Sequence, residues 1–265
     1  MRIISFSNQK GGVGKTTSTA NVGGALASLG KKVLLIDIDP QANLTKGLGF
    51  NPNDLELNIY HVLLKRVPIN DVWLAIDDYI DTKKGKPATS NLWLVPANKM
   101  LSSGAIELEI SKDIYQRKLY NALIPVINAD IFDFILIDCP PNLGSLTMNA
   151  LCASNEIIIP LEPEFYALEG IEPLLELMNL IQEELKMDLH VSGVVATRYI
   201  EQNLHQDVVK VLKADFKELC FKTVIRKNVS LGEAPSNGKD IFRYKKDSNG
   251  AEDYMKLTKE IMARG

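Results

Sequence analysis

Short apolar runs alternate with longer amphipathic stretches along most of the chain. Several of the short runs are almost continuously apolar, which is typical of strands covered by helices on both faces. They predict strands at Ile3–Ser7, Lys32–Ile36, Leu92–Pro96, Phe132–Asp138, Glu156–Leu161, Val191–Thr197 and Cys220–Val224. The longer stretches predict helices at Thr17–Leu29, Ile59–Lys65, Ala105–Ile127, Leu146–Cys152, Ala167–Leu185, Asn203–Phe216 and Ala251–Met262. The alternation predicts an α/β fold with a single doubly wound, mainly parallel sheet flanked by helices.

The distribution of polar and helix-breaking residues gives no sign of a domain boundary. The most polar segment, residues 77–87, is expected to form a surface loop before the third predicted strand. The sequence shows neither an internal repeat nor a low-complexity tract. We therefore expect one domain over residues 1–265.

Composition narrows the class of protein. Of the 265 residues, 46% are hydrophobic and 24% are charged, which excludes disordered, collagen-like and coiled-coil classes. No apolar run approaches the roughly 18–20 residues of a transmembrane helix, and the first residues do not resemble a secretory signal. The three cysteines are widely spaced and odd in number, which favours a reducing compartment over a disulfide framework. We expect a cytoplasmic protein that does not span a membrane.

Charge is unevenly distributed, although the formal net charge is only −3. Residues 1–185 contain 15 basic and 22 acidic side chains, whereas residues 186–265 contain 15 and 11. Association with a polyanion depends on the local field rather than on the total charge. Solvated helix faces would explain the basic segment as well, so charge alone leaves both interpretations open.

A glycine-rich loop follows the first predicted strand and leads into a predicted helix. Its glycines permit close backbone approach, so that successive N–H groups and the helix N-terminus can bind phosphate oxygens. In such a loop Lys15 contacts the β- and γ-phosphates of a nucleotide, and the Thr16 hydroxyl coordinates Mg²⁺. The usual pattern G-x-x-x-x-G-K-[ST] requires a glycine where this chain has Gln9. The loop therefore predicts nucleotide binding by an unusual P-loop.

Carboxylates follow two of the predicted strands. Asp37 and Asp39 come after the second strand, and Asp138 ends the apolar run Phe134–Ile137. The carboxyl ends of parallel strands face the crevice in which such sheets bind ligands. An apolar strand ending in aspartate is the Walker B pattern, in which the carboxylate supports Mg²⁺. We expect Asp138 and Asp37 near the metal; helix capping is the alternative for the Asp37–Asp39 pair.

The loop Lys10–Thr16, Lys-Gly-Gly-Val-Gly-Lys-Thr, resembles the deviant Walker A loop KGGxGK[ST] of the ParA/MinD family of ATPases. Further segments are similar to the partition branch of that family, often called ParA/Soj. They are Asp37–Gln41, Asp138–Pro141, Pro163–Gly170, Leu231–Lys239 and Ser248–Ala251 with Tyr254. The matches run from residue 3 to about residue 261. The resemblance implies an ATPase that uses ATP and Mg²⁺ and forms a homodimer around two ATP molecules.

The resemblance also implies roles for single residues. It places Lys10 at the nucleotide of the partner subunit and makes Asp39 the residue that orients the attacking water. It implies phosphate contacts from the loop residues Gly11, Gly12, Val13, Gly14, Lys15, Thr16 and Thr17. It also implies that Pro235 and Asn237 lie in a loop near the adenine, although a surface turn explains that stretch as well.

The resemblance implies that the chain binds DNA. Because the sequence begins directly on the P-loop strand, we expect it to lack the N-terminal helix-turn-helix extension of the larger plasmid partition ATPases. We therefore expect nonspecific, salt-dependent DNA binding by basic side chains of the ATPase body. The candidates are Arg198, Lys210, Lys213, Lys217, Lys222, Arg226, Lys227 and Lys245. Gln202 stands where relatives often have an arginine. The implied partner is a ParB-type protein that stimulates hydrolysis, and the implied location is the nucleoid.

Two other functions remain open. A membrane-surface positioning ATPase of the MinD kind would need a basic amphipathic C-terminal helix. Tyr254, Leu257 and Ile261 share one face of the last predicted helix, but the acidic residues around them favour packing against the body. A regulator that uses the nucleotide only as a switch, with little turnover, is the other alternative. The three histidines have no spacing that indicates a metal site.

Overall fold

The computed structural model describes residues 1–76, 80–81, 89–111, 115–164 and 171–264. Its main sheet has seven strands in the order β3-β6-β2-β7-β1-β8-β9. Six are parallel: Arg2–Phe6 (β1), Val33–Asp37 (β2), Leu92–Val95 (β6), Phe134–Asp138 (β7), Glu156–Leu161 (β8) and His190–Ala196 (β9). The edge strand Leu74–Ala75 (β3) is antiparallel to β6, and Ile80–Asp81 (β4) pairs with Thr89–Ser90 (β5) in a separate small sheet.

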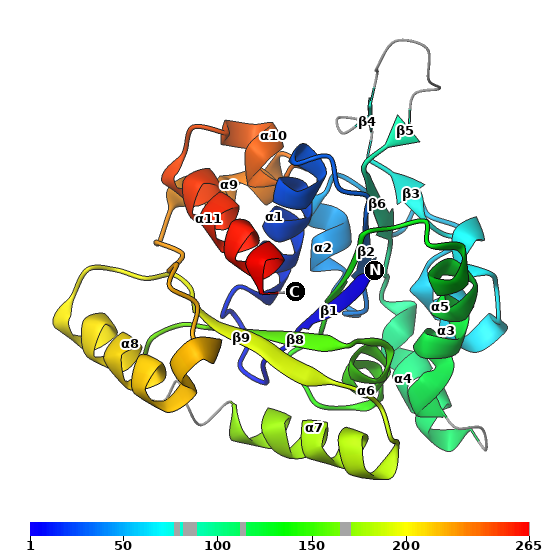
Figure 1. Ribbon diagram of the computed structural model, residues 1–265. Helices are drawn as coiled ribbons and strands as arrows, with labels where there is room; N and C mark the ends of the chain where they lie inside the picture. Colours follow the sequence, from blue (N-terminus) through cyan, green and yellow to red (C-terminus); the bar gives the residue numbers. More distant parts are fainter. Residues whose placement is uncertain (77–79, 82–88, 112–114, 165–170, 265) are drawn as a thin grey trace.

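Helices cover both faces of the sheet (Figure 1). One face carries Lys15–Ser28 (α1), Asn43–Gly47 (α2), Val229–Ser236 (α9), Ile241–Lys245 (α10) and Asn249–Ala263 (α11). The other face carries Ile59–Lys65 (α3), Met100–Ile110 (α4), Lys118–Ala129 (α5) and Ser145–Ala153 (α6). Glu172–Glu184 (α7) and Asn203–Phe216 (α8) pack near β8 and β9. Short 3₁₀ turns lie at Ile69–Asp71 (η1), Tyr115–Arg117 (η3) and Lys217–Leu219 (η5).

Alternation along each strand explains why the strands are apolar throughout. Ile3 packs with the α3–α6 side, whereas its neighbour Ile4 packs with the α1 and α11 side. Leu34 and Leu35 divide between the two cores in the same way. Successive side chains of a strand point to opposite faces, so a strand with helices on both sides needs apolar residues at every position. The predicted doubly wound, mainly parallel sheet is confirmed.

Two predicted elements differ from the structure. The predicted strand Cys220–Val224 is wrong: Cys220 forms only an isolated bridge with Val194 of β9. The backbone N–H groups of Lys222 and Thr223 donate to the Glu260 carboxylate at 2.9 Å, so they do not form a ladder. The predicted helix Ala105–Ile127 is interrupted, because α4 ends where Ser111 takes an extended conformation and α5 begins at Lys118.

The remaining helices agree with the prediction to within a few residues wherever the chain is described. Residues 167–170, which open the predicted helix Ala167–Leu185, lie outside the described residues, as does most of the predicted loop 77–87. The short helices α2, α9 and α10 are not predicted. None of the described helices combines the length and apolar character that a membrane crossing needs.

Candidate functional site

Three central strands end side by side and bring the predicted site residues to one edge of the sheet. Residue Phe6 at the end of β1 is in register with Asp138 of β7, and Asp138 is in register with Asp37 of β2. The glycine-rich loop follows β1 directly and leads into α1. Lys15, Asp37, Asp39 and Asp138 are all buried. The structure therefore gathers the P-loop lysine and the three predicted carboxylates in one place.

The loop leaves the start of α1 open. Gly12 and Gly14 have φ of +77° and +87°, a left-handed backbone that favours glycine. Gly14 is the N-cap of α1, and no side chain caps the helix there. The hydroxyl of Thr197, which directly follows β9, donates to the carbonyl of Val13 at 2.7 Å and so holds the glycine-rich loop in position. An uncapped helix N-terminus with a held glycine loop is a binding site for an anion such as phosphate.

Lys15 is a buried cation at the first position of α1. Its ammonium donates to the backbone carbonyl of Lys10 at 2.9 Å, which closes the loop on itself. Burial lowers the pKa of Lys15, and the negative charges of Asp138 and Asp39 partly offset this. Lys15 can therefore give up its hydrogen bond to the Lys10 carbonyl and donate to a phosphate oxygen instead.

Asp138 is the least satisfied polar group of the site. Its side chain is fully buried, and neither carboxylate oxygen has a well-formed hydrogen bond from the described residues, although the Thr16 hydroxyl lies close enough to lower its pKa. Burial, and then the charge of Asp37, raise its pKa well above the ordinary value, while Thr16 and Lys15 act in the opposite direction. Orphaned carboxylate oxygens beside a threonine hydroxyl fit Mg²⁺, which prefers oxygen ligands.

The protein side chains at this edge do not by themselves surround a metal ion. Across the described part of the chain, no three His, Cys, Asp or Glu side chains gather in a way that could hold a metal ion. Mg²⁺ usually keeps several waters and shares phosphate oxygens with one or two protein ligands. The arrangement of Thr16 and Asp138 fits that sparser mode.

Asp37 has a different set of contacts from those expected for a metal ligand. Its carboxylate accepts hydrogen bonds from the backbone N–H and the hydroxyl of Thr45, at 2.9 and 2.7 Å, and from the N–H of Asp39 at 3.2 Å. Burial raises its pKa to about 6, although the Thr45 hydrogen bonds lower it. These hydrogen bonds hold α2 and the loop that carries Asp39; the expected contact of Asp37 with the metal shell stays a prediction. Asp39 in turn accepts from the N–H of Gln41 at 2.9 Å.

Lys10 and Arg198 both reach residues that follow β8. The Lys10 ammonium forms an ion pair with Glu164, and hydrogen bonding with Lys10 lowers the pKa of Glu164. Arg198 pairs with Glu162 at 3.3 Å. Its guanidinium also donates to the carbonyl of Gly12 at 3.3 Å, and its own backbone is left-handed with φ of +51°. Arg198 therefore lies at the P-loop, and Lys10 is engaged within its own chain.

A cavity of about 330 Å³ adjoins the P-loop on the side of Gly12, Gly14 and Thr17. Its further walls come from the end of β9 and from the segment that precedes α9, including Thr197, Asn228 and Leu231. The sequence analysis did not predict this second wall. Asn228, which caps α9, could have indicated that a helix begins there beside the P-loop. Pro235 and Asn237, which were expected near a base, do not line the cavity. Pro235 is helical and instead lies against Gly47.

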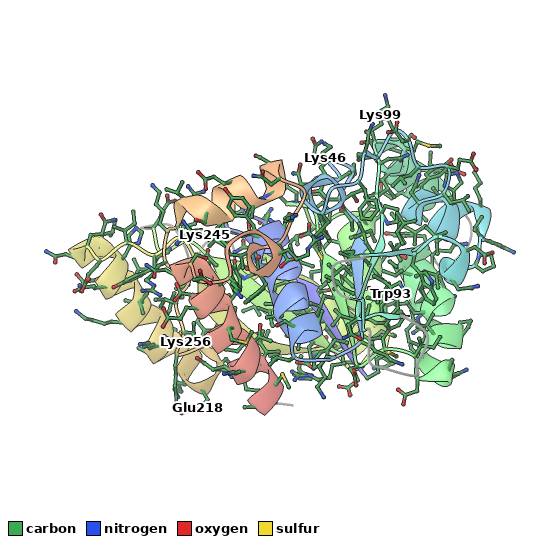
Figure 2. The ribbon with its side chains drawn as sticks, turned by 90° about the horizontal axis from the view of Figure 1, so that it is seen from above. Lys46, Trp93, Lys99, Glu218, Lys245 and Lys256 are labelled. Carbon is green, nitrogen blue, oxygen red and sulfur yellow. The ribbon has the colours of Figure 1, made fainter. Side chains whose placement is uncertain are left out.

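The basic candidates for DNA contact are spread over several elements. Lys210 and Lys213 are exposed on α8, and Lys217, Lys222, Lys227 and Lys245 are exposed beyond it (Figure 2 labels Lys245). Arg226 forms ion pairs with Asp253 and Glu252 at 2.6 and 2.8 Å. These two carboxylates compensate its charge, so Arg226 is the weakest of these candidates.

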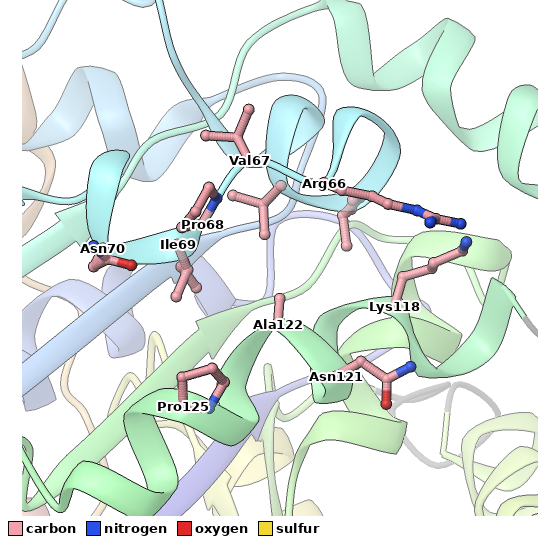
Figure 3. A pocket seen from close by; sticks show the side chains of 11 residues that line it. Arg66, Val67, Pro68, Ile69, Asn70, Lys118, Asn121, Ala122 and Pro125 are labelled. Carbon is pink, nitrogen blue, oxygen red and sulfur yellow. The ribbon is translucent and has the colours of Figure 1, made fainter.

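A second hollow, of about 630 Å³, lies between α3, η1 and α5 (Figure 3). Most of its lining is apolar, with Arg66 and Lys118 at one end. None of the predicted site residues lines it, so we do not assign it to the nucleotide site.

Comparison with known proteins agrees with this geometry. The family model described as an AAA domain matches residues 1–191. The chain is 42% identical over 267 residues to the sporulation initiation inhibitor protein Soj of Bacillus subtilis, covering 100% of this chain and 99% of that protein. It is 42% identical over 264 residues to the chromosome-partitioning ATPase Soj of Treponema pallidum, covering 99% and 98%. Among solved structures, cobyrinic acid a,c-diamide synthase of Mycobacterium smegmatis, with a bound ATP analogue and magnesium, matches with a TM-score of 0.78 and 30% identity over 98% and 93% of the two chains.

Proposed function

Because the chain belongs to the Soj/ParA family of chromosome-partitioning ATPases, we propose that it hydrolyses ATP to cycle between a DNA-bound dimer and a released state. As a member of this family the chain is an ATPase with a role in partition. The observation that carries the proposal is the buried Asp138 carboxylate with both oxygens orphaned, close to Lys15 and to the open N-terminus of α1. Residues 1–265 act as a single ATPase domain in this account.

The first step is binding of the ATP phosphates. The amide groups of Gly11–Thr17 and the α1 N-terminus surround the phosphate oxygens, and the Lys15 ammonium leaves the Lys10 carbonyl for the β- and γ-phosphates. The cavity beside Gly14 and Thr17 is of a size to take the rest of the nucleotide. ATP and Mg²⁺ are the ligands, in line with the ATP analogue and magnesium bound in the similar Mycobacterium smegmatis structure.

Hydrolysis needs a held metal and an oriented water. Thr16 and Asp138 would hold Mg²⁺, which neutralises phosphate charge when it is bound. Asp39 accepts a hydrogen bond from the attacking water and so orients it. Asp37 holds the backbone of Asp39, and the N–H of Gln41 donates to the Asp39 carboxylate. The Lys15 ammonium stabilises the charge that develops on the phosphoryl oxygens.

Dimerisation would complete the site. Lys10 is held by Glu164 of its own chain. Its release from that exposed ion pair costs little, because ion pairs at the surface are weak. Once free, Lys10 can extend to the nucleotide of the partner subunit, which links dimer formation to ATP.

DNA binding would then follow from the exposed lysines on and beyond α8. These side chains contact phosphates and carry no sequence information, so the binding is nonspecific. A ParB-type protein stimulates hydrolysis and so releases the DNA. The apolar face of α11 supports this account over membrane association, because Tyr254, Leu257 and Ile261 are buried.

The variant Asp39→Ala tests the assigned chemistry. We expect it to bind ATP like the wild type, to form a dimer that persists, and to release phosphate at least tenfold more slowly, in line with loss of a group that assists proton transfer or water positioning. Asp215→Ala, an exposed aspartate on α8, is the matched control and should behave like the wild type. Phosphate release by Asp39→Ala at the wild-type rate would remove Asp39 from the mechanism.

A further inference from the structure

A hollow of about 660 Å³ adjoins the loop that carries Asp39. Its walls are the residues after β2, the segment from Lys46 to Asn53, the start of α4 and the end of α9. Pro235, Ser236 and Gly238 line this hollow and not the cavity beside Gly12 and Gly14. The Leu231–Lys239 stretch therefore contributes to a cavity separate from the one beside the P-loop.

Two glycines form a rigid junction in its wall. Gly49 and Gly238 have φ of +95° and +67°. A Cβ atom on Gly238 would lie 2.7 Å from the Cα of Gly49, and a Cβ atom on Gly49 would lie 3.1 Å from the carbonyl oxygen of Gly238. Such close approach requires glycine on both sides. Closely packed backbone atoms form this part of the wall, so the shape of the hollow does not depend only on the positions of side chains.

The lining has the chemistry of an anion site. Lys46 and Lys99 are its charged members, and no carboxylate occurs among the described residues that line it. Its other polar side chains are uncharged: Gln41, Asn51, Asn53, Ser102 and Ser236, of which the Asn51 amide already donates to the Asp54 carboxylate at 2.8 Å. Figure 2 shows Lys46 and Lys99 near each other along one edge of the molecule, whereas Lys256 and Glu218 lie toward the opposite edge.

The hollow is joined to Asp39 by two hydrogen bonds. The Lys46 ammonium donates to the carbonyl of Gln41 at 2.7 Å, and the N–H of Gln41 donates to the Asp39 carboxylate at 2.9 Å. Ala42, the next residue, is left-handed with φ of +53° although it is not glycine. An anion that draws Lys46 away from Gln41 would loosen this strained loop and so change how Asp39 is held.

We propose that this hollow is an effector site for a phosphorylated small molecule of about nucleotide size, and that its occupancy changes the rate of ATP hydrolysis through the Asp39 loop. Phosphate oxygens accept hydrogen bonds from ammonium, hydroxyl and amide donors, all of which the lining supplies. The volume lies within the range of small-molecule sites. The change in rate rests on the proposed function of Asp39, whereas the binding site does not.

Binding is tested in the full chain carrying Lys15→Ala, so that the P-loop no longer holds phosphate. Isothermal titration calorimetry uses inorganic tripolyphosphate as the probe. We expect binding, and we expect added Lys46→Gln and Lys99→Gln to weaken it at least about tenfold. Lys256→Gln, an exposed lysine on α11, is the control and should leave the affinity unchanged. Thermal melts establish that every variant is folded.

Three results would overturn the site. They are absence of binding to the Lys15→Ala protein, equal affinity in the Lys46→Gln/Lys99→Gln protein, and equal weakening by Lys256→Gln. A short DNA duplex that binds through Lys46 and Lys99 while tripolyphosphate does not would also overturn it, and would place these lysines on the DNA surface.

The effect on hydrolysis is measured separately at saturating ATP. Wild type and Lys99→Gln should have the same basal rate, since Lys99 contacts none of the groups assigned to catalysis. The probe also competes with ATP at the P-loop, and this competition affects both proteins equally. We therefore expect the probe to cause a further change of at least about twofold in the hydrolysis rate of the wild type alone. Identical responses would overturn the coupling. If neither protein hydrolyses ATP, the proposed function and the coupling both fail, while the calorimetry still decides the site.

Discussion

Replacing Asp138 by asparagine should stabilise the nucleotide-free protein while removing a group that hydrolysis needs. The wild-type carboxylate is fully buried, and neither oxygen has a well-formed hydrogen bond from the described residues. An unsatisfied buried group costs about 1–3 kcal/mol, and more when it is charged; the asparagine amide is still a buried polar group, so the expected gain of about 2 kcal/mol comes from removing the charge, after the lost attraction to Lys15. With an unfolding entropy of about 0.56 kcal/mol/K for 265 residues, the melting midpoint should rise by about 4 °C.

The pH dependence gives the same reasoning a second test. Burial, followed by the charge of Asp37, raises the pKa of Asp138, and burial raises that of Asp37 to about 6. A carboxyl group with a higher pKa in the folded than in the unfolded chain binds its proton more tightly when folded, so protonation stabilises the fold. The wild type should therefore gain stability as the pH falls from about 7 to about 5, through the Asp37 pKa of about 6, and Asp138→Asn should gain less.

The assay is thermal unfolding followed by circular dichroism, without nucleotide, at both pH values. Asp215→Asn changes an exposed aspartate and is the control; its midpoint should stay within about 1 °C of the wild type. Phosphate release by Asp138→Asn should be lost at the same time. A lower midpoint for Asp138→Asn, or a pH dependence equal to that of the wild type, would refute the view that this buried charge is unsatisfied.

Three further substitutions test the packing and the ion pair that support the fold. Gly193→Ala in β9 should lower the free energy of unfolding by about 1–3 kcal/mol, because its Cβ would lie 2.4 Å from the Phe221 ring. Gly232→Ala in α9, with nothing within 4 Å, should instead stabilise by about 0.5–1 kcal/mol; urea unfolding compares the two, and equal effects would contradict the packing. Glu156→Gln should cost about 1–3 kcal/mol at neutral pH, because its amide can accept only one of the two hydrogen bonds from Arg2, both 2.6 Å long, and carries no charge to pair with the guanidinium. Burial raises the pKa of Glu156, but the Arg2 hydrogen bonds outweigh burial, so the pKa is lowered overall. The stability advantage of the wild type over Glu156→Gln is therefore present above the usual glutamate pKa and should shrink as the pH falls below about 4. A difference in stability that stays constant with pH would argue against an ionic contact.

The sequence allowed the sheet and the P-loop to be predicted because their signals are local. Continuous apolar runs mark strands covered on both sides, and Lys10–Thr16 lies between such a strand and a helix. The carboxylates at strand ends were also correctly brought to one edge, since parallel strands end together.

What the sequence could not supply depends on contacts between distant residues. The hydrogen bonds that Asp37 accepts from Thr45 were not predicted, because they come from a short helix that has no periodic signal of its own. Pro235 was expected in a loop, but it is helical and packs on Gly47, about 190 residues earlier in the chain. The segment 220–224 has the composition of a strand, yet a carboxylate of α11 takes the N–H groups that a strand would use. For Pro235 and the segment 220–224, a partner far away in sequence decided the local structure.

The most direct test of the account is the affinity of the full chain for duplex DNA of unrelated sequences, measured with ATP and with ADP across a salt titration. The Asp39→Ala protein is used so that ATP persists. The account predicts binding with ATP that is independent of sequence, falls steeply as salt rises, and is at least tenfold weaker with ADP. No binding at the lowest salt, or equal affinity with ATP and ADP, would contradict it.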